Sequence, residues 1–250
     1  MLEEPAAEAR PAASNLRFAC SANYLQLMGG LLYASCMTRP DIAYHCAFLC
    51  QFMQDPSPAA YEAGLGVIAY LYSTKDLGLT YRGSPRTCSE PQATTTTEPI
   101  VQSDSSFGKT PFPFGGGFVE RRNCVVAWIS RKIKFKVPDS SCMAELAAIV
   151  VMIKEGQFVL NIEQDMGVKS TILHVVSDSK SGVDIVKNPG VTKRSAHYDR
   201  VLHYGRELYM LGGIKIWHTP DSQMMADGLT KVVEREKFLK CRNYMMNVKE

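Results

Sequence analysis

The chain has 250 residues, of which 46% are hydrophobic and 21% are charged, and its formal charge is +3. This composition excludes a disordered or fibrous chain and allows one large globular domain or two small ones. No apolar run approaches the roughly 18 residues that a membrane-spanning helix needs, and the acidic, Pro/Ala-rich residues 1–15 are unlike a secretory signal. We therefore expect an intracellular protein without a membrane partner, whose eight cysteines are free thiols.

Charge is unevenly distributed along the chain. Residues 1–97 contain 6 Lys/Arg and 8 Asp/Glu, whereas residues 98–250 contain 22 and 17. The basic excess lies in the second half, which is consistent with a polyanionic partner for that half.

The first third of the chain is predicted to be helical. Residues 1–20 have too few apolar side chains to fold alone and are predicted to be a disordered tail. Residues 21–81 show three helical periodicities separated by proline-containing breaks, and residues 77–81 then read as a short strand. We interpret residues 21–81 as a small helical unit and the aperiodic, Ser/Thr-rich residues 82–97 as a linker.

One cluster in the helical unit has the residue types of a metal site. His45, Cys46 and Cys50 lie close in sequence, but no second Cys/His pair lies at ligand spacing. Because Cys46 and Cys50 are four residues apart, they share one side of a helix, and we interpret them as core residues.

Residues 98–240 are predicted to form a domain of strands and helices, followed by a tail at 241–250. Residues 171–176 are rich in β-branched and apolar side chains, which is typical of a central strand that helices cover on both faces. Ser179 or Ser181 can cap the helix that follows this strand. The other expected elements are strands at 100–103, 114–118, 124–129, 131–137 and 214–218, and helices from about 141, at 193–211 and after 221.

The strand expected at 131–137 alternates strictly between basic and apolar residues. Three lysines share one face of it: Lys132, Lys134 and Lys136. Such a row is consistent with contacts to a phosphate backbone and, equally, with an edge strand whose charges prevent aggregation.

Four acidic residues fall at the ends or in the first turns of the expected elements: Asp104, Glu145, Asp178 and Asp227. A carboxylate directly after a central strand, such as Asp178, points into the crevice at the edge of the sheet where ligands of α/β folds bind. Taken alone, each acid is more often a surface charge or a helix cap. Together, four carboxylates supply the hard oxygen ligands that two Mg²⁺ ions need in a phosphodiester hydrolase.

Motifs in both halves occur in the order seen in one protein family. The first half contains TRPDIAY, and the second contains SDSSFG, MAELAAI, VVSDSKSGVDIVKNP, KRSAHYD and HTPDSQMMADGLTK. Over about residues 24–238 the chain resembles the C-terminal part of copia-type retrotransposon Pol polyproteins, which comprises the end of reverse transcriptase and a ribonuclease H domain. The resemblance implies an α/β fold, a ribonuclease H-like mixed five-stranded sheet flanked by helices, preceded by a small helical connection region.

The resemblance also implies a function. It is the endonucleolytic hydrolysis of the RNA strand of RNA·DNA hybrids by a two-metal mechanism, with two Mg²⁺ ions for which Mn²⁺ can substitute. The implied partners are the RNA·DNA hybrid and the rest of a Pol polyprotein. The chain lacks the Tyr-x-Asp-Asp polymerase signature, so polymerisation by these residues alone is not expected.

Site residues follow from the same resemblance. Asp104, Glu145, Asp178 and Asp227 are the implied metal ligands, and His218 is implied to assist proton transfer or product release. Candidate contacts to nucleic acid, besides the three lysines at 132–136, are Lys180, Lys193 and Arg194. His197 and Asp199 match a recurrent His-x-Asp whose role stays open.

Two alternatives stay open at this point. The family usually has Ala-Asp-Trp-Ala-Gly after its first Asp, whereas this chain has Ser-Ser-Phe-Gly after Asp104. A decayed or domesticated copy that binds nucleic acid without cleaving it is therefore one alternative. The other is a different nuclease or transposase on the same sheet, since a fold alone does not determine the substrate. An integrase-type enzyme would place its last acid as Glu on a longer helix, which Asp227 does not match.

Overall fold

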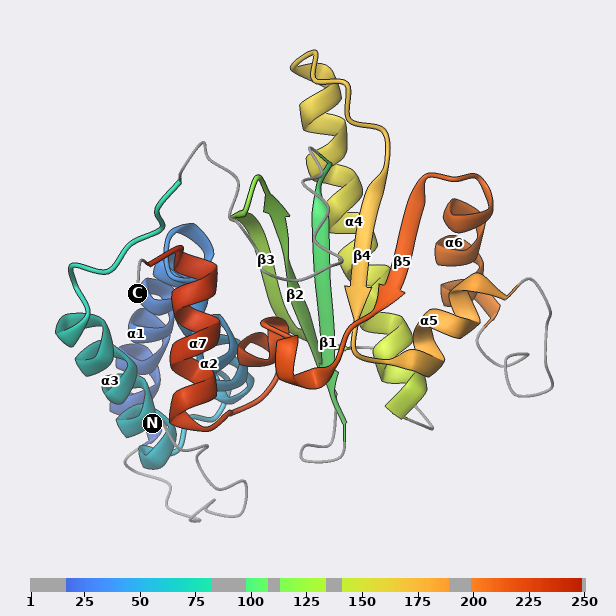
Figure 1. Cartoon of the computed structure of the whole chain (residues 1–250). Coiled ribbons are helices and arrows are strands. Elements are labelled where there is room, and N and C mark those ends of the chain that lie inside the picture. The colour runs from blue at the N-terminus through green and yellow to red at the C-terminus, as the bar shows by residue number, and fades with distance from the viewer. Residues whose placement is uncertain (1–16, 82–97, 108–112, 134–140, 189–198, 249–250) are drawn as a thin grey trace. The chain divides into compact units, whose positions relative to one another are not determined.

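The computed structural model describes residues 17–81, 98–107, 113–133, 141–188 and 199–248 (Figure 1). The chain divides into two compact units: the first combines residues 1–79 with 232–250, and the second comprises residues 80–231. The expected second domain thus extends too far at its C-terminal end, because residues after Lys231 pack with the first unit.

The first unit is helical, as the sequence predicts. It contains α1 (Arg17–Met37), η1 (Pro40–Ile42), α2 (Ala43–Leu49), η2 (Cys50–Phe52), α3 (Pro58–Ser73) and α7 (Arg235–Met246). The side chain of Ser57 caps α3 by accepting the N–H of Ala60. The strand expected at 77–81 is wrong: these residues are irregular, since alternation alone does not supply the neighbouring strand that a sheet requires.

Apolar side chains of α1, η1, α2 and α3 form the core of the first unit. Its buried members are Tyr24, Met28, Leu31, Ile42, Cys46, Leu49, Ala60 and Val67. Cys46 is fully buried and Cys50 is partly buried, so a core role is confirmed for Cys46. Among the described residues, no disulfide bond is formed by Cys36, Cys46, Cys50, Cys124, Cys142 or Cys241.

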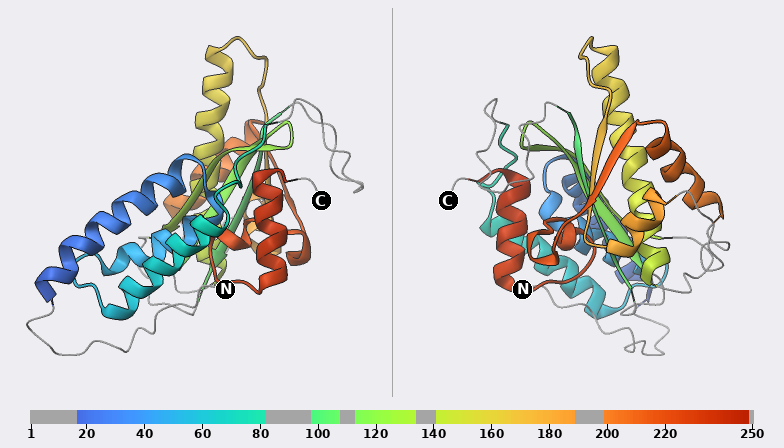
Figure 2. Two further views of the ribbon diagram at one scale, coloured as in Figure 1. Left: turned by 90° about the vertical axis from the view of Figure 1, so that its left-hand side faces the viewer. Right: turned by 45° about the vertical axis from the view of Figure 1, so that its right-hand side comes forward.

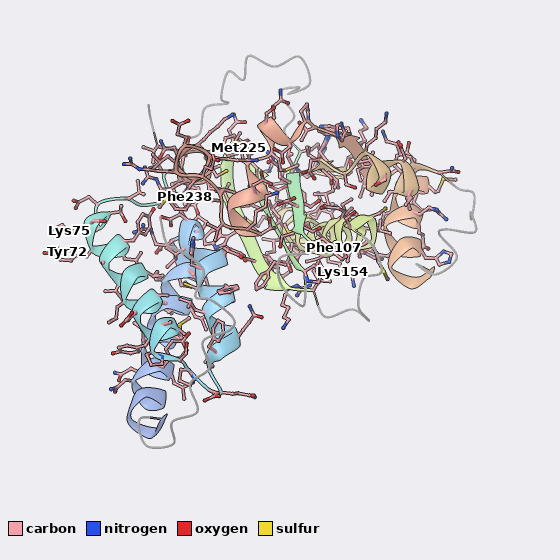
Figure 3. The ribbon with its side chains drawn as sticks, turned by 90° about the horizontal axis from the view of Figure 1, so that it is seen from below. Tyr72, Lys75, Phe107, Lys154, Met225 and Phe238 are labelled. Carbon is pink, nitrogen blue, oxygen red and sulfur yellow. The ribbon has the colours of Figure 1, made fainter. Side chains whose placement is uncertain are left out.

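A buried ion pair in the TRPDIAY motif joins η1 to the end of α3. Arg39 donates to both carboxylate oxygens of Asp41, at 2.9 and 2.8 Å, and the Tyr70 hydroxyl donates to Asp41 at 2.6 Å. Arg39 also donates to the hydroxyl of Thr74 at 2.7 Å. The motif therefore specifies how these elements pack. Just beyond the end of α3, Lys75 lies over the ring of Tyr72 (Figure 3).

Helix α7 belongs to the first unit although it follows the second unit in sequence. The ring of Phe238, labelled in Figure 3, packs edge-on against Tyr70 and His45, with centroid distances of 5.9 and 6.4 Å. The tail expected at 241–250 is therefore helical as far as Met246, and Cys241, Met245 and Met246 are buried. The sequence pattern did not indicate this helix, because the contacts that hold it come from residues far away along the chain.

The second unit contains a five-stranded mixed sheet. Its strands are β1 (Ile100–Ser106), β2 (Phe114–Arg121), β3 (Cys124–Lys132), β4 (Leu173–Ser177) and β5 (Ile214–His218). Their order is β3-β2-β1-β4-β5, with β1, β4 and β5 parallel and β2 antiparallel to both of its neighbours. This confirms the ribonuclease H-like fold class. The strand expected at 131–137 is the end of β3 as far as Lys132. Ile133 is irregular, and residues 134–137 lie outside the described residues.

Three helices cover one face of the sheet: α4 (Ser141–Asp165), α5 (Lys180–Lys187) and α6 (Asp199–Met210) (Figures 1 and 2). Ser179 caps α5 by accepting the N–H of Gly182 at 3.1 Å, as predicted. Between helices and sheet lies a core that includes Val101, Leu146, Ile149, Met152, Ile153, Leu173, Val175, Val183 and Ile216. No helix in the described ranges combines the length and hydropathy needed to cross a lipid bilayer.

The opposite face of the sheet is covered near β1 and β2 by a short 3-10 turn, η5 (Ala226–Leu229), which follows another 3-10 turn, η4 (Asp221–Gln223). The α-helix expected after residue 221 is therefore wrong. Gly228 disfavours an α-helix, and Gly116 in β2 allows close approach, since a Cβ there would lie 3.0 Å from the Leu229 carbonyl oxygen. Its neighbour Gly115 faces Ala148 of α4 instead, so η5 and α4 lie on opposite faces.

Candidate metal centre

Two of the four predicted acids come from neighbouring parallel strands. Asp104 lies in β1, and Asp178 directly follows β4. Ser103 and Ser177 are partners in the parallel register, so the residues that follow them, Asp104 and Asp178, lie next to each other at the carboxyl edge of the sheet. This is the edge at which the sequence predicted a ligand site.

Asp227 reaches the same place from the face of the sheet that η5 covers. Asp104 is paired with Gly116, so its side chain shares the face on which Leu229 approaches that glycine. The backbone N–H of Met225, labelled in Figure 3, donates to Gln102 of β1 at 3.1 Å and anchors the segment just before η5.

Three of the predicted acids converge in this way. Oxygen atoms of Asp104, Asp178 and Asp227 lie within 4.8 Å of one another. Asp104 and Asp227 are almost completely buried, and Asp178 is partly exposed. Within the described ranges, these residues form the one group of three or more His, Cys, Asp or Glu side chains with the spacing of metal ligands. Sequence reasoning placed all three at this site.

Glu145, in the first turns of α4, is close enough to interact electrostatically with this group. Burial, and then the charge of Asp178, raise the pKa of Glu145 to about 7. Burial likewise raises the pKa of Asp104 well above its usual value, and burial followed by the charge of Asp227 raises that of Asp178. Carboxylates with raised pKa values in a cluster are typical of sites that complete their charge balance with a bound group.

Unpaired oxygen atoms show that a divalent ion fits this donor set. Among the described residues nothing donates a hydrogen bond to Oδ1 of Asp104, Oε2 of Glu145 or Oδ1 of Asp178, and all three atoms are buried. Buried acceptors without a donor are uncommon and call for a partner. Carboxylate oxygens are also the ligands that hard cations such as Mg²⁺ prefer.

Two residues of the ADGLTK motif complete the site, and sequence reasoning missed both. The Thr230 hydroxyl donates to Oδ2 of Asp104. Nζ of Lys231 lies 2.8 Å from Oδ1 of Asp227 and 3.5 Å from Oδ2 of Asp104. Burial alone would lower the pKa of Lys231, but Asp104 and Asp227 raise it above its ordinary value. The four-residue spacing between Asp227 and Lys231 was the signal that would have indicated this pair.

The remaining predicted site residues are not members of the acid cluster or are not described. His218 is exposed at the end of β5, where it pairs with Ser177 of β4. Lys180 is exposed at the first position of α5, and Lys132 is partly buried at the end of β3. Lys134, Lys136, Lys193, Arg194 and His197 lie outside the described residues, and Asp199 begins α6.

Retrovirus-related Pol polyproteins are among the curated proteins that are similar to this chain. The retrovirus-related Pol polyprotein from transposon TNT 1-94 of Nicotiana tabacum is 30% identical over 219 residues, which are 88% of this chain and 16% of the relative. The corresponding polyprotein from transposon RE1 of Arabidopsis thaliana is 25% identical over 217 residues, 86% of this chain and 14% of the relative. Retrovirus-related Pol polyproteins of plant transposons are homologues of this chain. The resemblance to copia-type Pol polyproteins is thereby confirmed.

The chain spans about one sixth of the length of these Pol polyproteins. No family model matches it. Among solved structures, the N-terminal RNase H domain of rv2228c from Mycobacterium tuberculosis is similar to this chain, with 15% identity and a TM-score of 0.43. The match covers 58% of this chain and 96% of the solved chain.

Proposed function

We propose that the second unit is a ribonuclease H that hydrolyses the RNA strand of RNA·DNA hybrids as part of a retrotransposon Pol polyprotein. One observation carries the proposal: Asp104, Asp178 and Asp227, which are distant in sequence, place oxygen atoms within 4.8 Å of one another at the carboxyl edge of the sheet. Homology to Pol polyproteins makes nucleic acid the expected substrate class.

The carboxylates have distinct positions in this mechanism. Asp104, Asp178 and Asp227 would hold Mg²⁺, and Glu145 would add a fourth carboxylate to this set. Bound Mg²⁺ supplies the Lewis acidity that activates water and offsets charge on the scissile phosphate. Thr230 keeps the Asp104 carboxylate oriented, and Gly116 leaves room for the turn that carries Asp227. Water is the nucleophile, so no covalent intermediate with the protein forms.

Exposed groups near the same edge are suited to hold the hybrid. Lys180 lies two residues after Asp178 and offers a charge to a phosphate. Phe107 directly follows β1 and is 46% exposed, so its ring is available for stacking or for contact with a sugar. His218 lies at the end of β5 and stays a candidate for proton transfer or product release. Because A-form hybrids are bound through phosphates and 2′-hydroxyls, little sequence preference is expected.

Cleavage assays with matched variants test the proposal. The full chain is incubated with labelled RNA·DNA hybrid, RNA duplex and DNA duplex in Mg²⁺. We expect cleavage of the hybrid alone, a loss of at least about a hundredfold in rate for Asp178→Asn, and no loss for Asp184→Asn. Asp184 is the matched control because it is exposed on α5 of the same unit. Binding to the hybrid should weaken steeply as salt increases.

Each other result points to a different function. Binding of the hybrid without cleavage would indicate a copy that has lost catalysis, and cleavage of DNA duplex would indicate a transposase-like nuclease. Equal rates for Asp178→Asn and the wild-type chain would remove the acid cluster from the mechanism.

A further inference from the structure

Lys231 lies inside the acid cluster rather than on the surface beside it. Its Nζ bridges Asp227 at 2.8 Å and Asp104 at 3.5 Å, and the side chains of these two acids are only 0% and 1% exposed. The backbone also places the lysine there, because its N–H donates to the Asp227 carbonyl oxygen at 3.2 Å. Position and contacts therefore both direct the ammonium group to the acids that are expected to bind metal.

A cation at this position compensates a defined imbalance. Asp104, Asp178 and Asp227 bring up to three negative charges within 4.8 Å, and Glu145 lies close by. Buried like charges at such distances repel one another strongly. The ammonium group offsets one of these charges, so the carboxylates can stay together when no metal ion is bound.

The same contacts put Lys231 in competition with a divalent ion. Mg²⁺ requires carboxylate oxygens at about 2.1 Å, and Nζ already contacts an oxygen of each of two acids. A divalent ion and an ammonium group on the same two carboxylates would also repel each other. With 29% of its side chain exposed, Lys231 can turn towards solvent when an ion enters.

We propose that Lys231 is a built-in counter-cation that competes with divalent metal for the carboxylates of Asp104 and Asp227 and so sets the metal affinity of the site. The inference rests on the metal-dependent function proposed above. It adds a positioning residue to the four acids and assigns a role to the last residue of the ADGLTK motif.

Direct metal binding tests the competition without reference to catalysis. Mg²⁺ and Mn²⁺ are titrated into the full chain and its variants by isothermal titration calorimetry. Lys231→Met keeps the length of the side chain and removes its charge, and we expect it to bind Mn²⁺ at least about tenfold more tightly than the wild-type chain. Lys231→Arg, which retains the charge, and Lys169→Met, which removes an exposed lysine of the same unit, should stay within about threefold of wild type.

Urea unfolding in the absence and presence of Mn²⁺ gives a second measurement. Tryptophan fluorescence reports on the second unit, because the two tryptophans, Trp128 and Trp217, both lie in its sheet. Without metal, we expect Lys231→Met to unfold at a lower urea concentration than wild type. Added Mn²⁺ should raise the unfolding midpoint of the variant more than that of wild type. Lys231→Gln serves as the uncharged variant if the methionine variant does not fold.

The outcomes separate the inference from the proposed function. Equal or weaker metal binding by both uncharged variants, with normal binding by wild type, overturns the competition and leaves the metal site intact. Failure of the wild-type chain and of every Lys231 variant to bind either ion overturns both.

Discussion

Single carboxylates in the second unit link its stability to pH. Burial raises the pKa of Glu145 from 4.5 to about 7, and burial also raises the pKa values of Asp104 and Asp178. An acid with a raised pKa binds its proton more tightly in the folded protein than in the unfolded chain. For Glu145 in the absence of metal, the stabilising contribution is therefore complete below about pH 4.5 and is lost as pH rises through about 7.

Glu145→Gln should remove part of this pH dependence. At pH 7.5 without divalent metal, we expect the variant to be more stable than wild type by up to about 3 kcal/mol, with the difference vanishing near pH 4.5. Urea unfolding followed by tryptophan fluorescence at a series of pH values measures it for the second unit. Glu207→Gln, at an exposed position of α6, is the control, and identical pH slopes for Glu145→Gln and wild type would contradict the prediction.

The buried pair of Arg39 and Asp41 makes a second prediction at this scale. Arg39→Met leaves the Asp41 carboxylate buried without its bidentate donor, so we expect the first unit to lose about 3 kcal/mol or more in free energy of unfolding. Tyr70→Phe, which removes one hydrogen bond to Asp41, should cost only about 1 kcal/mol. Far-UV circular dichroism during urea unfolding detects both losses.

The exposed Arg235 in α7 offers the control for this series. Arg235→Met should change stability by less than about 0.5 kcal/mol. An Arg39→Met chain as stable as wild type would show that the ion pair contributes little to the packing of η1 on α3.

At the scale of elements, sequence patterns within a few residues were sufficient to predict some helices and strands and not others. The apolar run of β4 and the cap residue Ser179 lie within a few positions of each other, and both were predicted. The adjacency of Asp104 and Asp178 also followed, because parallel strands align their carboxyl ends. The 3-10 turn η5 did not follow, since its conformation depends on contact with Gly116 in another strand.

The close approach of η5 to β2 can be tested by adding one methyl group. In Gly116→Ala the new Cβ would lie 2.5 Å from the Ile129 carbonyl oxygen and 3.0 Å from that of Leu229. Backbone atoms cannot move aside easily, so we expect a loss of about 1–3 kcal/mol in stability and weaker Mn²⁺ binding through displacement of Asp227. Calorimetry and urea unfolding of the second unit measure the two effects.

A second glycine of the same unit, Gly205, provides a control in which the change to alanine should raise stability rather than lower it. In Gly205→Ala the new Cβ in α6 would be no closer than 3.6 Å to its neighbours, and alanine favours a helix by about 0.5–1 kcal/mol. We expect this variant to be slightly more stable and to bind metal normally. Equal behaviour of the two alanine variants would exclude steric displacement of η5.

At the scale of the whole molecule, the two units should respond to pH in opposite directions. Burial lowers the pKa of His45 in the first unit to about 4 from 6.5. Between pH 6.5 and 4, His45 is therefore protonated in the unfolded chain but neutral in the folded unit. The contribution of neutral His45 to stability is complete above about pH 6.5 and is lost as pH falls towards 4. The raised acids of the second unit produce the reverse trend over the same range when metal is absent.

We therefore expect acidification from pH 7 to pH 5, without metal, to weaken the first unit and strengthen the second. Circular dichroism detects the helices of both units, and tryptophan fluorescence follows the second unit alone. The part of the circular dichroism transition that tryptophan fluorescence does not share therefore reports on the first unit. His45→Gln should flatten the trend of the first unit and leave the tryptophan signal unchanged. For the wild-type chain, the same pH trend in the fluorescence transition and in the part of the circular dichroism transition that fluorescence does not share would refute the assignment.

The first unit is assembled from two stretches of chain that flank the second, and this has a consequence during translation. Helices α1 to α3 leave the ribosome well before α7. The contacts of Tyr70 and His45 with Phe238 therefore cannot form until the entire sheet has been synthesised. Stalled nascent chains of increasing length should therefore gain protease resistance in the sheet first. Resistance of the helical unit should follow only when residue 246 has emerged from the exit tunnel.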